Sequence, residues 1–216
     1  VGKHGLLVLF SLGKLVGTLY LALAIFIIGI LVPVALLAKV PLKRFAAAVK
    51  EPFLIAFSTT SSEAALPKAL QNMEALGVPR PIVSFVLPLG YTFNLDGTTL
   101  YLSLAAVFVA QAAGVHMPIE KQILMLLTLM LTSKGVAAVP RASLVILAGT
   151  LATFDLPLAG VALILGVDTL MDMARTSVNV LGNCLASVVM ARWEGVFEEK
   201  EIQPQAEAEP AAATLV

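Results

Sequence analysis

PLGYTFNLDGT, residues 88–98, lies inside an apolar segment, residues 82–113, that is long enough to cross a lipid bilayer. Proline, glycine, asparagine and aspartate favour a helix less than the apolar residues around them, so they predict a break in a membrane helix. Non-helical backbone at membrane depth is tolerated only where it is buried in protein or lines a wet cavity. We therefore predict that the broken helix, 82–113, is packed among other membrane helices.

Composition extends the membrane prediction to most of the chain. Of its 216 residues, 59% are hydrophobic and 13% are charged, whereas soluble domains carry about 25% charged residues. The mean hydropathy is +0.95. The formal net charge is zero, so no basic surface points to a nucleic-acid partner, and the single cysteine, Cys184, cannot form an internal disulfide. We therefore expect an integral membrane protein in contact with lipid.

The apolar pattern divides the chain into membrane segments and a tail. We predict a span at 6–39, a helical hairpin at 45–80, the broken helix at 82–113, a second hairpin at 119–156, a helix at 158–194 and a tail at 196–216. Each hairpin holds two apolar pieces too short to cross, so it enters the membrane and turns back. Basic residues follow the first span, and the positive-inside rule assigns them to the cytoplasm: Lys39, Lys43, Arg44 and Lys50. The acidic, Ala- and Pro-rich tail predicts a disordered cytoplasmic segment.

The two hairpins carry related sequences at their turns. Residues 60–67 read TSSEAALP, and residues 132–140 read TSKGVAAVP, with one extra residue. Each hairpin precedes a long helix with polar residues in its middle, and the two hairpins enter from opposite sides. Two short segments can match by chance, but this arrangement is typical of secondary transporters. The predicted fold class is an all-α membrane protein with two re-entrant helical hairpins and interrupted transmembrane helices in an inverted repeat.

The last predicted helix has a polar stripe along one face, because its members are spaced by four, three, one, three and four positions: Asp168, Asp172, Arg175, Thr176, Asn179 and Asn183. A charge at mid-bilayer costs about 2.5–3.5 kcal/mol, so the stripe must face a polar site. The Arg175 guanidinium suits a carboxylate, and the Asp172 carboxylate suits an ammonium. Together they describe a receptor for a molecule that carries both groups. The alternative is that Asp172 and Arg175 pair with each other.

Asp96 is the other charge at membrane depth. With Asn94 and the carbonyl groups freed around Gly90, it forms a cluster of oxygen ligands of the kind that an alkali cation needs. The alternative is a helix break whose polar groups satisfy one another. The hairpin turns add hydroxyl groups, and helix ends there would add backbone N–H groups suited to anions.

Four motifs resemble the dicarboxylate/amino acid:cation symporter family, also called the glutamate transporter family. They are SSEAALP at 61–67, NLDGT at 94–98, the second turn at 133–140 and DMARTSVN at 172–179, within a resemblance that covers residues 6–195. Bacterial proton/glutamate-aspartate symporters are the most similar members. Because family members are about twice as long, the resemblance implies that residues 1–195 are the C-terminal part of a mobile transport domain. The missing N-terminal scaffold would form a homotrimer.

The resemblance also implies which residues bind the solutes. The substrate site would comprise Ser62, Thr98, Val139, Asp172, Arg175, Thr176 and Asn179. The cation site would comprise Gly90, Thr92, Asn94, Asp96, Ser133, Asn179 and Asn183. Arg175 would hold the side-chain carboxylate of an acidic amino acid, and Asp172 would hold its ammonium. No catalytic residue and no cofactor are implied, and Na⁺ would be the one metal ion, as a coupling ion.

Three departures from the family pattern concern the coupling ion. Asn183 stands where sodium-coupled relatives have an aspartate. Lys134 and Val136 replace small or hydroxyl residues near a cation site, where an ammonium would repel sodium. These departures favour a proton over Na⁺ as the coupling ion.

Further departures concern the second hairpin turn. Ala138, Arg141 and Ser143 stand where many relatives have glycines, which predicts a stiffer turn. Arg141 would also add positive charge at the entrance. Because the two turns lie close together in the family, we also predict an ion pair between Glu63 and Lys134.

The resemblance implies a secondary active symporter of glutamate or aspartate, working by alternating access in the plasma (inner) membrane, and not an enzyme. A C4-dicarboxylate:cation symporter of the same family is the alternative. The residues alone also allow two other classes of membrane protein. One is an intramembrane aspartyl protease with Asp96 and Asp168 as its dyad, and the other is a channel.

Overall fold

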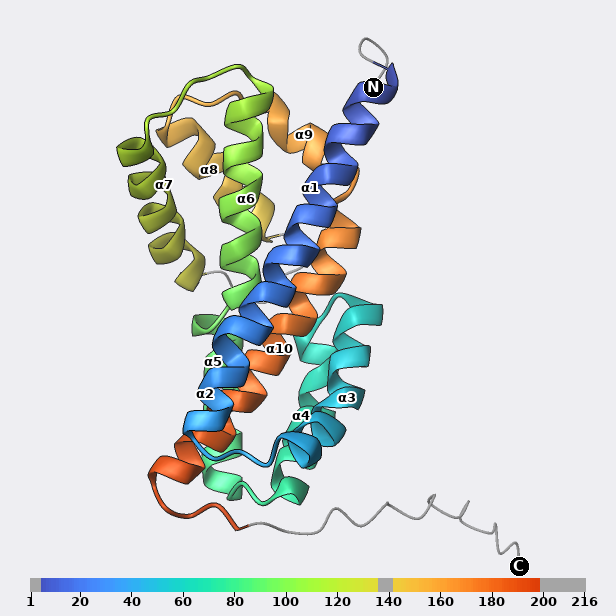
Figure 1. Ribbon diagram of the computed structural model, residues 1–216, viewed down its shortest axis with the longest axis vertical. Helices are drawn as coiled ribbons and strands as arrows, with labels where there is room; N and C mark the ends of the chain where they lie inside the picture. The colour runs from blue at the N-terminus through green and yellow to red at the C-terminus, as the bar shows by residue number, and fades with distance from the viewer. Residues whose placement is uncertain (1–4, 136–141, 199–216) are drawn as a thin grey trace, which may run out of the picture.

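All regular secondary structure in the described part of the chain is helical. The computed structural model describes residues 5–135 and 142–198, and Figure 1 shows their arrangement. The helices are α1 (Gly5–Phe26), the π-helical turn η1 (Ile27–Leu31), α2 (Val32–Leu37), α3 (Leu42–Thr59), α4 (Ser62–Leu76), α5 (Arg80–Phe93), α6 (Asp96–Ala112), α7 (Ile119–Thr132), the 3-10 turn η2 (Ser133–Gly135), α8 (Ala142–Thr153), α9 (Ala159–Leu165) and α10 (Asp168–Trp193). The all-α class predicted from the sequence is confirmed.

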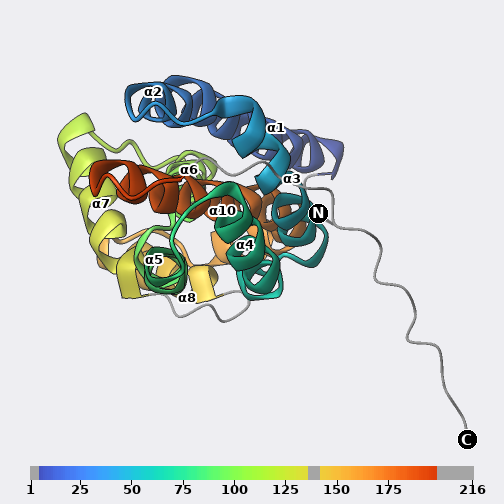
Figure 2. The same ribbon diagram turned by 90° about the horizontal axis from the view of Figure 1, so that it is seen from below.

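Helix α10 is the axis on which the other helices pack. It contacts α1, α3, α4, α5 and α6, and Figure 2 shows it between α1 on one side and α4 and α5 on the other. One apolar core surrounds its first half, with α1, α6, α7 and α8, and a second surrounds its other half, with α2, α3, α4 and α5. Polar residues on α10 are therefore held between other helices, away from lipid.

The first helix is continuous from α1 through η1 to α2, and it covers one side of the bundle. Pro33 has no N–H to donate, and the turn just before it widens, so that the Val32 N–H bonds the Ile27 carbonyl. Two segments, Val8–Leu37 and Arg80–Ala112, are long and apolar enough to cross a membrane. The first exposes large apolar side chains, with Ile28 69% and Leu37 84% exposed.

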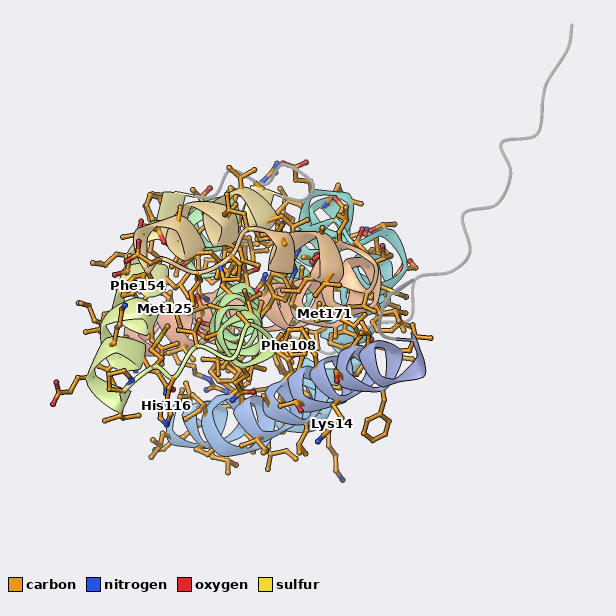
Figure 3. All side chains as sticks on the ribbon, turned by 90° about the horizontal axis from the view of Figure 1, so that it is seen from above. Lys14, Phe108, His116, Met125, Phe154 and Met171 are labelled. Carbon is orange, nitrogen blue, oxygen red and sulfur yellow. The ribbon has the colours of Figure 1, made fainter. Side chains whose placement is uncertain are left out.

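Side chains divide between an outward surface and the packed interior. Figure 3 shows Lys14 on the outward side of α1, and Met125 and Met171 between the helices. Both methionines are 0% exposed. Exposed apolar residues on the outer helices would be unfavourable in water, so the surface suits a lipid environment.

The break inside 82–113 is two residues long. Helix α5 continues through Pro88 and Gly90, and only Asn94 (φ −114°, ψ 77°) and Leu95 (φ −110°, ψ 61°) leave the helical region before α6 begins. The interruption is therefore shorter than the run of weak helix formers suggests. Tertiary contacts of α5 with α4 and α10 hold it helical despite its proline and glycine.

The helix predicted over 158–194 is divided in the structure, which corrects that prediction. Helix α9 ends at Leu165, and α10 begins at Asp168. Between them, Val167 takes φ −121° and ψ 0° and donates its N–H to the Ile164 carbonyl at 2.9 Å. Gly166 weakens the helix there, since glycine costs about 1 kcal/mol in a helix interior. The polar stripe lies entirely on α10.

The two helix pairs approach the middle of the molecule from opposite ends (Figure 1). Helices α3 and α4 pack together, and Thr60 turns the chain between them with φ 53°. Ser61 caps α4 by accepting a hydrogen bond from the Ala64 N–H at 3.2 Å. Helix α8 packs beside α7, and the connection between η2 and α8 lies outside the described residues.

The beginning of the predicted tail packs against the helices. The Arg192 guanidinium lies 4.3 Å from the centre of the Phe197 ring. The Glu198 N–H donates to the Gly77 carbonyl at 3.2 Å. The rest of the predicted tail, 199–216, lies outside the described residues.

Candidate functional site

The polar stripe of α10 is buried along most of its length. Asp168, Arg175, Thr176, Asn179 and Asn183 are each between 0% and 7% exposed. The side chain of Asp172, which completes the stripe, is 15% exposed. The six residues that the spacing predicted therefore lie along one mainly buried face of α10.

Arg175 is held by two carboxylates and an aromatic ring. Its Nε donates to Asp172 Oδ1 at 2.9 Å, and its Nη2 lies 4.0 Å from Asp168 Oδ1. The guanidinium carbon lies 4.1 Å from the centre of the Tyr101 ring, within the range of a cation–π interaction. Thr176 Oγ1 also donates to Asp172 Oδ1, at 2.8 Å. The internal Asp172–Arg175 pair, the alternative left open by the sequence, is thus present in this structure.

One arm of the Arg175 guanidinium remains unpaired. Its Nη1 is buried and has no hydrogen-bond partner among the described residues. A buried donor without an acceptor costs about 1–3 kcal/mol. The arrangement can therefore accept one further anionic group, such as a carboxylate, on that arm.

Tyr101 is a residue of this cluster that the sequence analysis missed. It lies on α6, is 1% exposed, and donates its hydroxyl to Asp168 Oδ1 at 2.9 Å. The ring and the carboxylate together hold the Arg175 guanidinium. The only sequence signal for this residue was its place one helical turn after Gly97. Its contact with α10 depends on how α6 and α10 pack, which the sequence does not show.

Asn179 and Thr98 connect the start of α6 to α10. Asn179 Oδ1 accepts hydrogen bonds from the backbone N–H groups of Gly97 and Thr98, at 2.8 and 3.3 Å. Its Nδ2 donates to Thr98 Oγ1 at 2.9 Å. Asn179, predicted as a ligand of both solutes, thus caps the N-terminus of α6.

The helix break brings Asn94, Asp96 and Asn183 together. One end of the Asn94 amide lies 3.1 Å from Asn183 Oδ1 and the other lies 3.1 and 3.2 Å from the two Asp96 oxygens. The Asn183 Nδ2 donates to the Asn94 backbone carbonyl at 3.3 Å. These three contacts contain only two NH₂ groups, so in any orientation of the amides at least one contact lacks a good donor–acceptor pair. The cluster therefore fits a bound cation or proton.

Gly90 allows the close approach of α5 to Asn183. A Cβ built on Gly90 would overlap the Asn183 amide. The Gly90 carbonyl already accepts the Asn94 N–H at 2.7 Å, so it is not freed by the break as the sequence suggested. Its second lone pair is the remaining ligand that it offers.

The other predicted ligands are dispersed around the break. Thr92 is half-buried in the last turn of α5, and Ser62 is the first residue of α4. Ser133 Oγ lies 3.3 Å from Thr99 Oγ1 and donates to the Met130 carbonyl at 3.0 Å. Val139 lies outside the described residues, as do Val136, Ala138 and Arg141, so the predictions about them stay predictions.

Lys134 and Glu63 lie in the turns of the two helix pairs, in η2 and at the start of α4. The described ion pairs contain no pair between Glu63 and Lys134, and Glu63 is exposed. Lys134 is half-buried. The predicted Glu63–Lys134 pair is therefore not formed among the described residues, and η2 packs against α5.

The two aspartates of the protease alternative lie in separate clusters. A Cβ built on Gly182 would lie 3.0 Å from Asp96 Oδ2, whereas Asp168 is at the start of α10, fourteen residues earlier. At 1.5 Å per residue, those points on α10 are about 21 Å apart. A catalytic dyad of Asp96 and Asp168 is therefore not formed.

A cavity lies beside the Asp96 cluster. It has a volume of about 340 Å³ and is apolar apart from Asn94 and Asp96. Its wall follows α10 from Gly182 to Trp193 and includes Leu31 of η1. The Asp96 cluster therefore borders a cavity whose lining reaches Trp193 at the end of α10.

Comparison with known proteins gives three informative relatives. The chain is 55% identical over 197 residues to the proton/sodium-glutamate symport protein of Bacillus subtilis (strain 168), covering 91% of this chain and 46% of that protein. It is 46% identical over 201 residues to the proton/glutamate-aspartate symporter of Escherichia coli (strain K12), covering 93% and 46%. It is 43% identical over 203 residues to a C4-dicarboxylate transport protein of Polynucleobacter asymbioticus, covering 94% and 46%.

The match extends over nearly the whole chain and about half of each relative. The chain spans about half the length of these curated relatives. Residues 1–193 match the sequence model described as the sodium:dicarboxylate symporter family. A family of membrane transporters accounts for the helical fold, for the apolar outer surface and for the buried charges of α10. The chain therefore belongs to the sodium:dicarboxylate symporter family, a family of membrane transporters.

Proposed function

We propose that this chain carries the solute-binding part of a cation-coupled symporter for acidic amino acids, glutamate or aspartate. The observation that carries the proposal is the buried Nη1 of Arg175, which has no partner among the described residues and lies beside the Asp172 carboxylate. Two of the relatives are named as glutamate or glutamate-aspartate symporters, which supports the same substrate class.

Binding would proceed by an exchange of partners on Arg175. The side-chain carboxylate of the substrate takes the free Nη1 arm and weakens the bond from Nε to Asp172. Asp172 then accepts the substrate ammonium through the oxygen that Arg175 and Thr176 do not use. The other proposed substrate ligands surround this pair: Ser62, Thr98, Val139, Thr176 and Asn179.

The charge of the cluster favours an amino acid over a diacid. Asp168 and Asp172 with Arg175 give two negative charges and one positive charge in a buried site. A C4-dicarboxylate brings two further negative charges and no ammonium, so Asp172 repels it. The relative named as a C4-dicarboxylate transport protein keeps this substrate as the second candidate.

The coupling cation would bind at the helix break. The contacts among Asn94, Asp96 and Asn183 lack one hydrogen, which supports a site for a positive species there. The proposed ligands are Gly90, Thr92, Asn94, Asp96, Ser133, Asn179 and Asn183. We favour a proton, with Na⁺ as the alternative, because Asn183 is a neutral amide where sodium-coupled relatives have an aspartate.

The transport cycle would depend on the arrangement of hairpins and broken helices. In this proposal, α3–α4 and α7–α8 are re-entrant hairpins of an inverted repeat, and residues 1–195 are the C-terminal part of a transport domain. The domain moves against a scaffold that forms a homotrimer, in the inner membrane, with the C-terminal tail in the cytoplasm. The opposite approach of the two helix pairs supports this reading (Figure 1).

Uptake by the full-length protein in proteoliposomes tests the proposal. Radiolabelled L-glutamate is competed with L-aspartate, succinate and L-serine, with sodium and with choline in its place. We expect strong competition by aspartate, weak competition by succinate and none by serine. Uptake that succinate blocks as well as aspartate does would instead favour the C4-dicarboxylate candidate.

Arg175→Ala is the matching variant. We expect glutamate uptake to fall at least about 30-fold, since removing one member of a buried charge pair costs about 2–5 kcal/mol. Arg192→Ala, on the same helix but stacked on Phe197, serves as the control and keeps uptake. Retained uptake in folded Arg175→Ala protein contradicts the proposed site.

A further inference from the structure

We infer that the groove between η1, α3 and α10 binds an anionic phospholipid, with an acyl chain in the groove and the headgroup on Lys43 and Lys50. The inference goes beyond the proposed symport, because it concerns a lipid partner of the fold and not the transported solute.

The groove has two walls and a floor, and it is apolar apart from Lys50. It has a volume of about 430 Å³. Leu31 of η1 and Ala35 of α2 line one wall, Phe45 of α3 lines the other, and Leu185 of α10 lies in the floor. Helix α10 packs against both η1 and α3, so it holds the two walls in place. Apolar cavities exclude water, so in a bilayer this groove takes up hydrocarbon.

Two lysines lie along the α3 edge of the groove. Lys43, Ala46 and Lys50 are spaced by three and four residues, which places them in one row on the helix. Ala46 and Lys50 line the groove, and all three residues are exposed. The two lysines are about 10 Å apart along the helix. Because lysine has a flexible four-carbon stem, both ammonium groups can reach one phosphate.

The charge of these lysines is not balanced within the described part of the chain. Neither Lys43 nor Lys50 forms an ion pair there. Glu51, the acidic neighbour of Lys50 in sequence, is paired instead with Lys68 of α4, with Oε2 3.1 Å from Nζ. Two ammonium groups beside an apolar groove are therefore available to an external anion that also carries a hydrocarbon chain.

The groove lies near the end of the bundle that we assign to the cytoplasmic membrane surface. The α2–α3 connection lies at the same end as the last turn of α10 (Figure 1). Trp193 in that turn is 78% exposed, and tryptophan is enriched where a membrane meets water. The positive-inside rule assigns the lysines after the first span to the cytoplasmic leaflet, which contains anionic lipids, and basic sites between membrane helices on that side bind their headgroups. A protein helix in the groove would bury apolar surface but would bring no anion to the lysines, whereas an anionic phospholipid supplies both.

The experiment compares phosphatidylglycerol with phosphatidylcholine of the same acyl chains, added to the full-length protein in detergent. Native mass spectrometry gives the bound fraction at each lipid concentration, and the thermal unfolding midpoint is measured in parallel. The double variant Lys43→Gln/Lys50→Gln removes the charge at the edge, and Ala46→Trp fills the groove. Lys121→Gln removes an exposed lysine of α7, and Ala47→Trp adds the same bulk at an exposed neighbour that does not line the groove, so both serve as controls.

We expect the wild type and both controls to bind phosphatidylglycerol more tightly than phosphatidylcholine and to unfold at a higher midpoint with it. The double lysine variant should bind phosphatidylglycerol about 25-fold more weakly, since each lysine near an anionic lipid contributes about fivefold. Its midpoint in phosphatidylcholine should not change, and Ala46→Trp should lose the rise that phosphatidylglycerol causes.

Equal affinity of the wild type for the two lipids overturns the inference, and so does wild-type affinity in the double lysine variant. A wild type that binds neither lipid, with a lower midpoint for Ala46→Trp in both, shows that a protein segment fills the groove and also overturns it. None of these measurements uses uptake, so their failure leaves the proposed symport standing.

Discussion

Asn179 shows that a residue on the polar stripe can have a structural role before any ligand is bound. Its amide oxygen accepts two backbone N–H groups of α6, and its amide nitrogen donates to Thr98. The first N–H groups of a helix have no acceptor inside the helix, so the Asn179 amide oxygen supplies the acceptor that is missing at the helix break. The prediction that Asn179 also binds the solutes stays a prediction.

Asn179→Ala should therefore lower the stability of the folded protein. Two buried N–H groups lose their acceptor, and we expect the free energy of unfolding to fall by about 1–3 kcal/mol. The measurement is the thermal unfolding midpoint in detergent, without substrate. Asn179→Asp keeps an acceptor at a helix N-terminus and should lose less. An unchanged midpoint in Asn179→Ala, together with lost uptake, would show that the residue acts only as a ligand.

Helices α6 and α10 approach closely because the first turn of α6 contains Gly97. A Cβ at this position would lie 2.9 Å from the Arg175 Cα and 3.0 Å from its carbonyl carbon. The contact carries Tyr101 to Arg175 and the start of α6 to Asn179. The Arg175 cluster and the helix break are thus joined by a single helix–helix contact.

Gly97→Ala should separate these two helices. Overpacking of this kind costs about 1–3 kcal/mol, and it would also displace Tyr101 from Arg175. We expect a lower unfolding midpoint and weaker glutamate binding. The matched control is Gly13→Ala on α1, where a Cβ would have nothing within 4 Å. There, alanine should leave binding unchanged and stabilise the helix by up to about 1 kcal/mol. Equal midpoints for the two variants would contradict the close approach.

Apolar residues lie both on the surface of the molecule and in its interior, which is the distribution that contact with lipid requires. Helix α1 exposes large apolar side chains on its outer face, and its inner face packs on α10. Cys184 lies on α10, in the apolar core that α10 shares with α2, α3, α4 and α5, and it is 0% exposed. A small thiol at this position is shielded from reagents for as long as the bundle is closed.

Cys184 should therefore report the unfolding of the bundle. We expect a thiol-reactive fluorescent maleimide to label it slowly at 25 °C and rapidly at the thermal transition. Glutamate at saturating concentration should shift that transition upward, because a ligand that binds only the folded state stabilises it. Cys184→Ser removes the delayed signal and identifies its source. Fast labelling of Cys184 in the folded protein would show that α10 is accessible.

The apolar segments, the site of the helix break and the polar stripe of α10 could all be predicted from the amino-acid sequence. These features are local: weak helix formers gather at 88–98, and the spacing from Asp168 to Asn183 follows the helical period. The support of Arg175 by Tyr101 and the separation of α9 from α10 emerge only when the helices pack. Each of these depends on distances between residues far apart in the chain or on packing around a glycine. Helical periodicity says which side a residue faces, but packing selects the partner that it meets there.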